Sequence, residues 1–337
     1  MKLLALIPAS QSKSPVRYYR GEGVLERMPG VEVSYLTEPM NWVSWLRAAK
    51  EYEVLYVMRS AQPEHVEWCR DAVTAGMKIW YDLDDDFTAV QPDNPACVVY
   101  GERDVQAAFG WFLRNADAIT VSTQQLKDKF EPKLGGRKIT VIPNALDDVS
   151  FPLAPVDGMQ KLFTWRGGGS HLLDLQAFTP EIISFLRNQE DYAIQFMGFY
   201  PFWMTKETGI RPEQLKYSKY ILSYWGFMQY FRAMNPWGHF VPLLDNDFNR
   251  AKSCISALEA VWAGAVPVVP DFPEWEIDGA LRYTSPEAMR KCMHLFATMS
   301  DRDRRDRWNL AAEWIRKNRM LSEITGRRME ILKELMD

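Results

Sequence analysis

Cysteine is scarce in this chain of 337 residues, which has only four: Cys69, Cys97, Cys254 and Cys292. They show no paired spacing, which excludes a disulfide-rich secreted scaffold and a cysteine-bound zinc site. We therefore expect a reducing, cytoplasmic environment. Long apolar runs are also missing, because no segment reaches the roughly 18 consecutive apolar residues that span a bilayer. The apolar start MKLLALIP is too short for the core of a signal peptide, so we interpret it as a buried first strand.

Neither sign of charge dominates the sequence. Its 40 basic and 44 acidic side chains give a formal net charge of −4, which excludes the global positive field of many nucleic-acid binders. Local basic surfaces remain compatible with this balance. Apolar residues make up 47% of the chain and charged residues 25%, which is typical of a soluble globular protein. The length suits two domains better than one core.

Short apolar runs alternate with amphipathic segments along most of the chain. In the first half the runs are LLALIP, VEVSYL, EVLYVMR, MKIWYDL, AITVS and KITVIPN, with helical patterns such as NWVSWLRAAKEY between them. This alternation predicts βαβ units, in which a parallel sheet is covered by helices on both faces. A second series, KLFTWRGGGSH, YAIQFMG, HFVPLLD and AVPVVPD, follows a proline-rich stretch near residues 150–160.

Two such series predict an α/β protein with twin Rossmann-like domains that face each other across a cleft. We place the first domain at residues 1–152 and the second at residues 160–312. The tail from Ser300 onward lacks strand patterns and predicts helices. We expect its last part, residues 313–337, to pack back toward the first domain.

Residues 241–269, VPLLDNDFNRAKSCISALEAVWAGAVPVV, form the most informative segment. The pattern predicts a strand, a loop, a helix over residues 249–263 and a second strand. A helix N-terminus beside the carboxyl end of a parallel strand presents unpaired backbone N–H groups, which suit a phosphate. Lys252 and Ser253 add a cation and a hydroxyl there, and Asn249 is the expected helix cap. The alternative is an ordinary amphipathic helix that packs on the core.

This segment resembles the donor-binding region of glycosyltransferases with the GT-B fold, in particular the family-4-like group. Glu259 matches the second glutamate of that group's paired-glutamate motif, and the resemblance implies that its carboxylate binds a ribose diol of the nucleotide sugar. Ala251 stands where the first glutamate is expected, so Asp245 or Asp247 is the candidate substitute. The string PLLDNDFNRAKS resembles a phage and bacterial subgroup that carries a PLxDNxFNxxKS pattern.

The resemblance covers nearly the whole chain. ADAITVSTQQLKDKF with KITVIPNALD is similar to the closing strand, helix and strand of the family's N-terminal domain, and FTWRGGGSHLLDL is similar to the first strand and glycine loop of its C-terminal domain. Glycines let a backbone approach a pyrophosphate closely, and an arginine neutralises phosphate charge without a metal. His171 could point into the cleft or simply occupy the first turn of the following helix, and we favour the second position. The implied donor-binding residues of this loop are Arg166, Gly167, Gly168, Gly169 and Ser170.

In GT-B enzymes the N-terminal domain binds the acceptor, so the loop after the first strand is of interest. Its sequence, PASQSKSPVRYYRGEG, resembles the PxxYYR loop of the same subgroup. A basic and aromatic mixture suits a phosphate-bearing acceptor, a sugar or a nucleobase. The alternative is a surface loop whose tyrosines pack locally. The candidate acceptor-binding residues are Arg17, Tyr18 and Arg20, and Lys13 would add to a basic cleft.

The run YDLDDDF places four aspartates in five positions directly after an apolar run. We interpret Asp82 as part of the strand, whereas Asp84, Asp85 and Asp86 reach the carboxyl edge of the sheet. The run invites comparison with the metal motif of GT-A enzymes, but the two-domain plan favours a metal-free site. The remaining role is that of a general base, which accepts the proton of the acceptor hydroxyl. Asp85 is the first candidate for this role, because repulsion between neighbouring carboxylates raises the pKa of one of them. Alternatively, the three aspartates cap the next segment and bind Arg59 or Arg103.

The leading functional hypothesis is therefore a metal-free and cofactor-free glycosyltransferase that uses a nucleotide sugar, with UDP the expected nucleotide. One candidate acceptor is a hydroxymethylated pyrimidine in phage DNA, inside a bacterial host cytoplasm. Another is a surface glycan or a lipid-linked sugar. A hypothesis of a different class is a non-catalytic nucleotide-sugar or glycan-binding protein, which the missing first glutamate supports.

Overall fold

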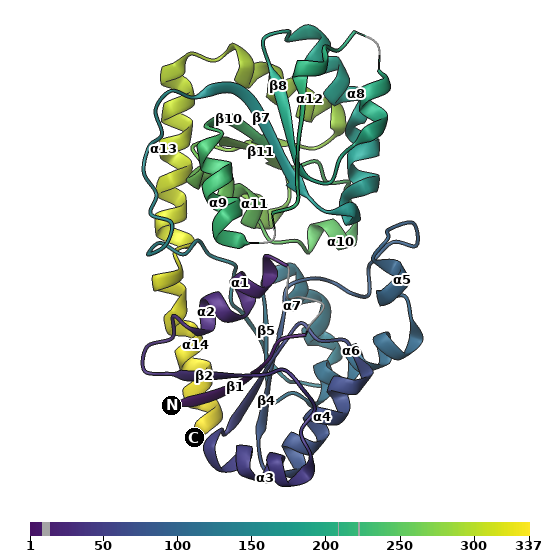
Figure 1. The fold of residues 1–337 in the computed structure, drawn as a ribbon, viewed down its shortest axis with the longest axis vertical. Coiled ribbons are helices and arrows are strands. Elements are labelled where there is room, and N and C mark those ends of the chain that lie inside the picture. The colour runs from purple at the N-terminus through teal and green to yellow at the C-terminus, as the bar shows by residue number, and fades with distance from the viewer. Residues whose placement is uncertain (9–13, 208, 222) are drawn as a thin grey trace.

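The computed structural model describes residues 1–8, 14–207, 209–221 and 223–337. Their strands form two sheets of six parallel strands each, and the two sheets follow one another along the long axis of the molecule (Figure 1). The predicted α/β class with two Rossmann-like units is confirmed. Lys13, which was expected to add to a basic cleft, lies outside the described residues.

The first sheet has the strand order β2-β1-β3-β4-β5-β6. Its strands are β1 (Lys2–Leu6), β2 (Glu32–Leu36), β3 (Val54–Met58), β4 (Lys78–Leu83), β5 (Ala118–Val121) and β6 (Ile139–Val141). The helices around it are α1 (Val16–Arg20), α2 (Glu22–Leu25), α3 (Trp42–Glu51), α4 (Pro63–Thr74), α5 (Cys97–Tyr100), α6 (Arg103–Asn115) and α7 (Gln124–Phe130). Every residue of β3 is buried, because helices cover both faces of this sheet.

The second sheet has the order β12-β11-β10-β7-β8-β9. Its strands are β7 (Gln160–Gly167), β8 (Ala193–Gly198), β9 (Leu215–Lys219), β10 (Pro236–Phe240), β11 (Val266–Pro270) and β12 (Leu281–Tyr283). The helices around it are α8 (Leu172–Asn188), α9 (Tyr224–Ala233), α10 (Asp247–Arg250), α11 (Ile255–Trp262) and α12 (Pro286–Thr298). The sequence patterns did not predict β9 and β12, since β9 is mostly exposed and polar and β12 has only three residues.

Two helices at the C-terminal end link the domains. Helix α13 (Asp301–Asn318) packs beside α11 and β11 of the second domain, and α14 (Leu321–Met336) packs on the first sheet. The chain crosses between the domains at Arg319 and Met320, where Leu146 and Met320 form an isolated bridge. In Figure 1 the two yellow helices run down one side of the molecule and span both sheets.

The helix predicted over residues 249–263 is broken in two. Helix α10 is capped by Asn246, whose side chain accepts from the backbone N–H of Asn249, and α11 begins only at Ile255. The carbonyl oxygen of Ala251 accepts a hydrogen bond from the hydroxyl of Thr123 in the first domain, at 3.0 Å. This tertiary contact takes up a carbonyl that a continuous helix would have used internally.

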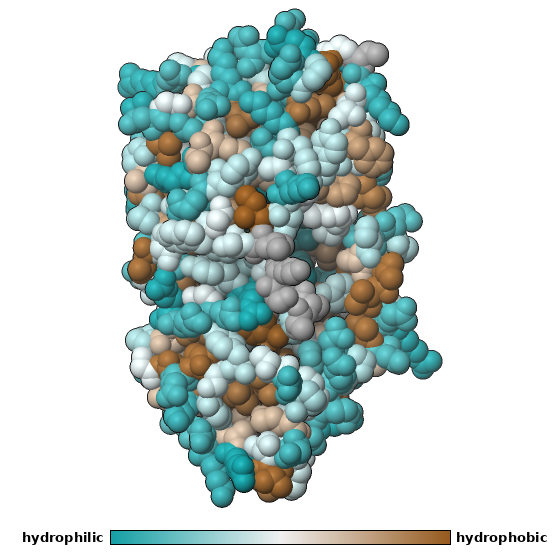
Figure 2. Space-filling view, viewed as in Figure 1, coloured by the Kyte–Doolittle hydropathy of each residue, from teal (hydrophilic) through white to brown (hydrophobic). Residues whose placement is uncertain are grey.

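The face of the molecule in Figure 2 is mostly hydrophilic, and its apolar residues form small separate patches. Within the described ranges, no helix is long and apolar enough to cross a membrane.

Candidate functional site

A cleft of about 460 Å³ lies between the two sheets. Its lining includes loops that follow β1, β3, β4 and β6 in the first sheet and β7, β9 and β10 in the second. The last residues of β7, β8 and β9 and parts of α1, α9 and α11 also line it. The carboxyl ends of parallel strands in both domains therefore face this space, which is where open α/β sheets bind their ligands.

The glycine loop after β7 forms one wall of the cleft. A Cβ at Gly167 would come within 2.6 Å of the Trp165 ring, whereas a Cβ at Gly168 would meet nothing within 4 Å. Gly167, Gly168 and Ser170 line the cleft, as predicted, but Gly169 is not among the lining residues. The open backbone at Gly168 can approach a ligand closely, because no side chain stands in the way.

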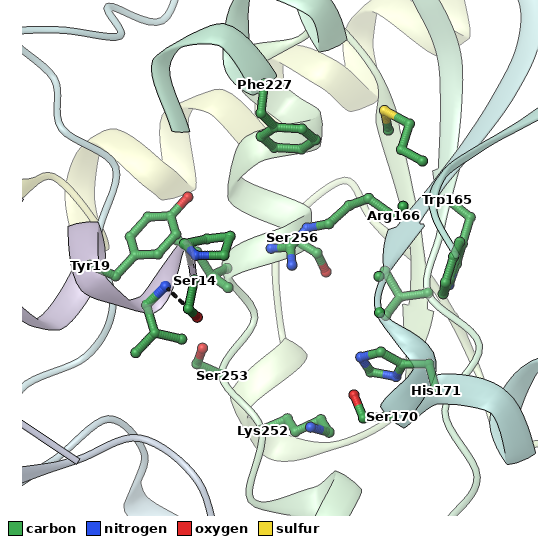
Figure 3. A pocket seen from close by; sticks show the side chains of 18 of the residues that line it. Ser14, Tyr19, Trp165, Arg166, Ser170, His171, Phe227, Lys252, Ser253 and Ser256 are labelled. Atoms are coloured by element: carbon green, nitrogen blue, oxygen red, sulfur yellow. Dashed lines mark hydrogen bonds between the residues drawn. The ribbon is translucent and has the colours of Figure 1, made fainter. Parts of the chain in front are cut away.

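The N-terminus of α11 points to the same space. Its N-cap residue, Cys254, makes no side-chain hydrogen bond to the first turn, so the orphan backbone N–H groups there are not capped by it. Lys252 and Ser253, in the loop before the helix, both line the cleft, as does Ser256 in the first turn. Figure 3 shows Lys252 and Ser170 at one end of the cleft and Phe227 at the other. The arrangement offers a cation, hydroxyls and a helix dipole to an anion.

Arg166 and Glu259 form an ion pair at the base of the cleft. The Nε of Arg166 lies 2.6 Å from Oε2 of Glu259, whose Oε1 accepts a hydrogen bond from the hydroxyl of Tyr19 in the first domain. Arg166 lines the cleft, but Glu259 is completely buried and does not. Burial raises the pKa of Glu259, while Arg166 and Tyr19 oppose that rise. In this structure Glu259 is therefore engaged by protein groups and not presented to a ribose.

Two further predicted donor-binding residues lie away from the cleft. Asp245 is exposed and binds Arg250, with oxygen-to-nitrogen distances of 2.5 and 2.7 Å. Asn249 is buried, and its amide donates to Asp174 at 2.8 Å and to the carbonyl of Leu244 at 2.9 Å. Asn249 is not the cap of α11, which was the role that placed it near a phosphate. Both residues hold their own loop in place.

The aspartate run separates into three environments. Asp84 and Asp85 line the cleft and share Arg59, at 3.3 Å and 2.7 Å respectively. Asp86 is completely buried outside the lining, where it binds Lys129 and accepts from the backbone N–H of Thr88 at 3.0 Å. The structure thus brings two of the three candidate bases to the cleft. No group of three or more His, Cys, Asp and Glu side chains in the described part of the chain could hold a metal ion.

The two carboxylates in the cleft differ in acidity. Burial raises the pKa of Asp84 to about 6, although Arg59 pulls it back, and the neighbouring Asp85 adds repulsion. Burial also acts on Asp85, but the charges of Lys252 and Arg59 outweigh it and leave the pKa of Asp85 below its ordinary value. One carboxyl of the pair is therefore basic enough to accept a proton near neutral pH, while the other stays ionised.

The residues predicted to bind the acceptor are mostly engaged elsewhere. Arg20 is completely buried and binds Asp82 through two nitrogens, at 2.7 and 2.5 Å. Arg17 binds Glu22 on the neighbouring helix, and the hydroxyl of Tyr18 donates to Asp147 at 2.5 Å. None of the three lines the cleft. Their neighbour Tyr19 does, together with Ser14, Pro15 and Val16.

Several cleft residues were missed by the sequence analysis. His171 lies in a short 3-10 turn (Gly169–His171), as expected for a first helical turn, but its imidazole also lines the cleft beside Ser170 (Figure 3). The sequence feature that could have indicated this position is Asp174, three residues later, whose carboxylate contacts the His171 ring. Asn144 also lines the cleft and donates to the hydroxyl oxygen of Ser253 across the domains, at 2.8 Å.

No known protein-family profile matches the chain, and no curated protein matches it in sequence. Solved structures do match. A sucrose-phosphate synthase from Thermosynechococcus elongatus is similar with a TM-score of 0.73 at 11% identity, over 100% of this chain and 99% of that chain. An alpha-glucosyltransferase in complex with UDP is similar with a TM-score of 0.66 at 11% identity, over 99% of this chain and 100% of that chain.

A third solved structure is an alpha,alpha-trehalose-phosphate synthase from Burkholderia xenovorans in complex with glucose-6-phosphate. Its TM-score is 0.66 at 13% identity, over 98% of this chain and 99% of that chain. At such low identity the likeness shows the fold. The chain has the GT-B fold, two Rossmann-like domains with a cleft between them, over its whole described length.

Proposed function

We propose that this protein is a glycosyltransferase that moves a sugar from a nucleotide sugar, with UDP as the nucleotide, to a hydroxyl group of an acceptor. The observation that carries the proposal is a contact across the cleft. Nζ of Lys252, beside the anion-binding end of α11, lies 3.6 Å from Oδ1 of Asp85 in the first domain. A phosphate-binding cation and a candidate base are thus adjacent, as transfer from a phosphate leaving group to a hydroxyl requires.

The donor diphosphate is proposed to lie between the glycine loop and the start of α11. Gly168 offers an unobstructed backbone, Lys252 and Arg166 offer positive charge, and Ser253 and Ser256 offer hydroxyls. Helix ends and cations stabilise the charge that develops on the leaving group, which is the work that a metal does in other transferases. The UDP-bound alpha-glucosyltransferase of the same fold supports this choice of nucleotide.

The Asp84 and Asp85 pair is proposed to act on the acceptor. The bond between the anomeric carbon and the diphosphate oxygen breaks, and the acceptor oxygen forms the new bond to that carbon. The proton of the acceptor hydroxyl passes to a carboxylate, for which the raised pKa of Asp84 is favourable. Arg59 binds both carboxylates and keeps them at the edge of the cleft.

For the acceptor, a hydroxyl of a sugar or glycan has more support than a hydroxymethylated pyrimidine in phage DNA. A DNA-binding cleft needs free cations along the phosphate backbone. Arg20 is buried against Asp82 and Arg17 is paired with Glu22, so neither is free for that purpose. A relative in fold was solved with glucose-6-phosphate, which makes sugar phosphates sensible members of an acceptor screen.

The proposal is tested by incubating the protein with a panel of nucleotide sugars and three acceptor classes, followed by mass spectrometry of the products. The acceptor classes are hydroxymethylated DNA, simple glycans and sugar phosphates. We expect a mass increase of one sugar residue in one class. Thermal stabilisation by UDP without any transfer would indicate the non-catalytic binding protein instead. If no nucleotide sugar is turned over and no nucleotide stabilises the protein, the proposed function is overturned.

A further inference from the structure

His171 is the only one of the four histidines that lines the cleft, and all four lie in the described part of the chain. His65 and His239 are buried inside their domains, and His294 lies beside Gln189 on the outside of the second domain. Burial lowers the pKa of His239 to about 3, so that ring stays neutral. A ligand in the cleft can therefore reach one imidazole, that of His171.

Asp174 fixes the orientation of this imidazole. Its Oδ2 lies 3.2 Å from Nδ1 of His171, and its Oδ1 accepts from the backbone N–H of Leu244 at 2.9 Å and from the amide of Asn249 at 2.8 Å. An ionised carboxylate can only accept hydrogen bonds, so Nδ1 of His171 carries a proton and donates it to Asp174. The second ring nitrogen, Nε2, is left for the cleft.

Charged groups face this ring from four segments. They are Asp174 on α8, Arg166 on β7, Lys252 in the loop before α11 and Asp85 in the loop after β4. Burial lowers the pKa of His171, and the cations Lys252 and Arg166 add to this effect against the opposing pull of Asp174. Near neutral pH the unliganded ring is therefore uncharged, with a lone pair on Nε2.

We propose that His171 takes up a proton when the diphosphate of a nucleotide sugar enters the cleft, and that its imidazolium then donates a hydrogen bond from Nε2 to a phosphate oxygen. This inference rests on the proposed function. The diphosphate brings negative charge to one side of the ring while Asp174 already holds the other side, so the charged form is favoured.

The imidazolium adds positive charge to the cleft, where the two neighbouring cations are each already paired with a carboxylate. Arg166 is already paired with Glu259, and Lys252 is shared with Asp85. During transfer, the electron pair of the breaking bond moves to the phosphate oxygen. The imidazolium stabilises that charge through its hydrogen bond and keeps its proton.

The test is calorimetric binding of UDP-glucose without acceptor, in buffers of different ionisation enthalpy, across pH values from about 5.5 to 8, where this ligand does not titrate. We expect the wild type to take up about one proton per ligand and its Kd to rise about tenfold per pH unit between the free and bound pKa values. His171→Gln keeps a neutral hydrogen-bond donor, so it should bind UDP-glucose without proton uptake and with a Kd that is nearly independent of pH.

Asp84 titrates in the same range, so Asp84→Asn is the matched control and should keep the proton uptake of the wild type. Uptake that persists in His171→Gln and disappears in Asp84→Asn would assign the proton to the carboxyl and overturn this inference. Binding by the wild type without proton uptake would also overturn it while leaving the proposed function intact. Absence of binding by UDP-glucose and by a panel of other nucleotide sugars would overturn the proposed function itself, and this inference with it.

Discussion

Lys252 and Asp85 belong to different domains, yet their charged groups lie 3.6 Å apart, and each side chain is less than a fifth exposed, at 15% and 17%. Lys252 also lies over the ring of Phe248, 4.1 Å from its centroid, which holds the ammonium group in position. A diphosphate that binds Lys252 must compete with Asp85 for it. If donor and acceptor bind as proposed, donor binding and the freedom of the Asp85 carboxylate are coupled through this single ammonium group.

The first prediction concerns the two cleft carboxylates. Replacement of the carboxylate that accepts the proton, by Asp84→Asn or by Asp85→Asn, should lower kcat for sugar transfer by about 10²- to 10⁴-fold, the usual contribution of a general base. Binding of UDP should not weaken in Asp85→Asn, because loss of that carboxylate frees Lys252 for phosphate. The measurements are steady-state kinetics and calorimetric titration with UDP.

Asp86→Asn is the matched control for these two variants. Asp86 does not line the cleft and instead binds Lys129, so this change should lower stability and leave kcat within a few-fold of the wild type. Unaltered transfer in both Asp84→Asn and Asp85→Asn would remove the pair from the reaction.

The second prediction is a pH dependence that distinguishes Asp84 from Asp85. A base works only when ionised, and the pKa of Asp84 is raised to about 6. If Asp84 accepts the proton, kcat at saturating nucleotide sugar should rise with pH up to about 6 and then level off. If Asp85 accepts it, the rate should stay flat to well below that value, because its pKa is lowered. Asp84→Asn should abolish the inflection in the first case.

The third prediction contrasts two arginines that are three positions apart. Arg20→Ala leaves Asp82 as an unpaired charge in the interior and should lower the free energy of unfolding by about 3–5 kcal/mol. Arg17→Ala removes a partly exposed pair with Glu22 and should cost about 1 kcal/mol or less. Urea denaturation measures both, and equal losses would contradict the assignment of Arg20 to the interior.

The fourth prediction uses the open backbone at Gly168. A methyl group there meets no protein atom within 4 Å, and the residue has a φ of −97°, which alanine also adopts. Gly168→Ala should therefore fold like the wild type and weaken UDP binding by about tenfold, equivalent to about 1.4 kcal/mol, because the methyl group keeps the diphosphate from the loop. Gly326→Ala, on α14, is the control and should not affect UDP binding. Wild-type affinity in Gly168→Ala would place the diphosphate elsewhere.

Much of the fold could be predicted from local pattern. Buried parallel strands are continuous apolar runs, and helices between them repeat with a period near 3.6, so MKIWYDL and AITVS were recognisable without a structure. The same reasoning placed a glycine loop and an aspartate run after strands, and Gly168, Asp84 and Asp85 do line the cleft. The polar edge strand β9 lacks that apolar signal, which is why it was missed.

Which of the predicted site residues line the cleft and which are buried depended on partners far away in the sequence. Asp86 meets Lys129 43 residues away, Arg20 meets Asp82 62 residues away, and Glu259 meets Tyr19 240 residues away. Each of these partners takes up a charge that the local sequence presents as free. Spacing along the chain contains no information about such pairings, because they depend on how distant segments pack within a domain and, for Glu259 and Tyr19, on how the two domains meet.

The sequence by itself determined that two parallel sheets would form and that their carboxyl edges would carry glycines, aspartates and a lysine, because periodicity and turn chemistry act over a few residues. Only the tertiary structure decided which of these groups share the cleft. Burial and pairing between residues far apart in the sequence retained Asp84, Asp85, Lys252 and His171 in the cleft and placed Arg20, Asp86 and Glu259 in the interior. Desolvation makes an unpaired interior charge too costly, so these charges had to meet partners that only the folded chain brings close.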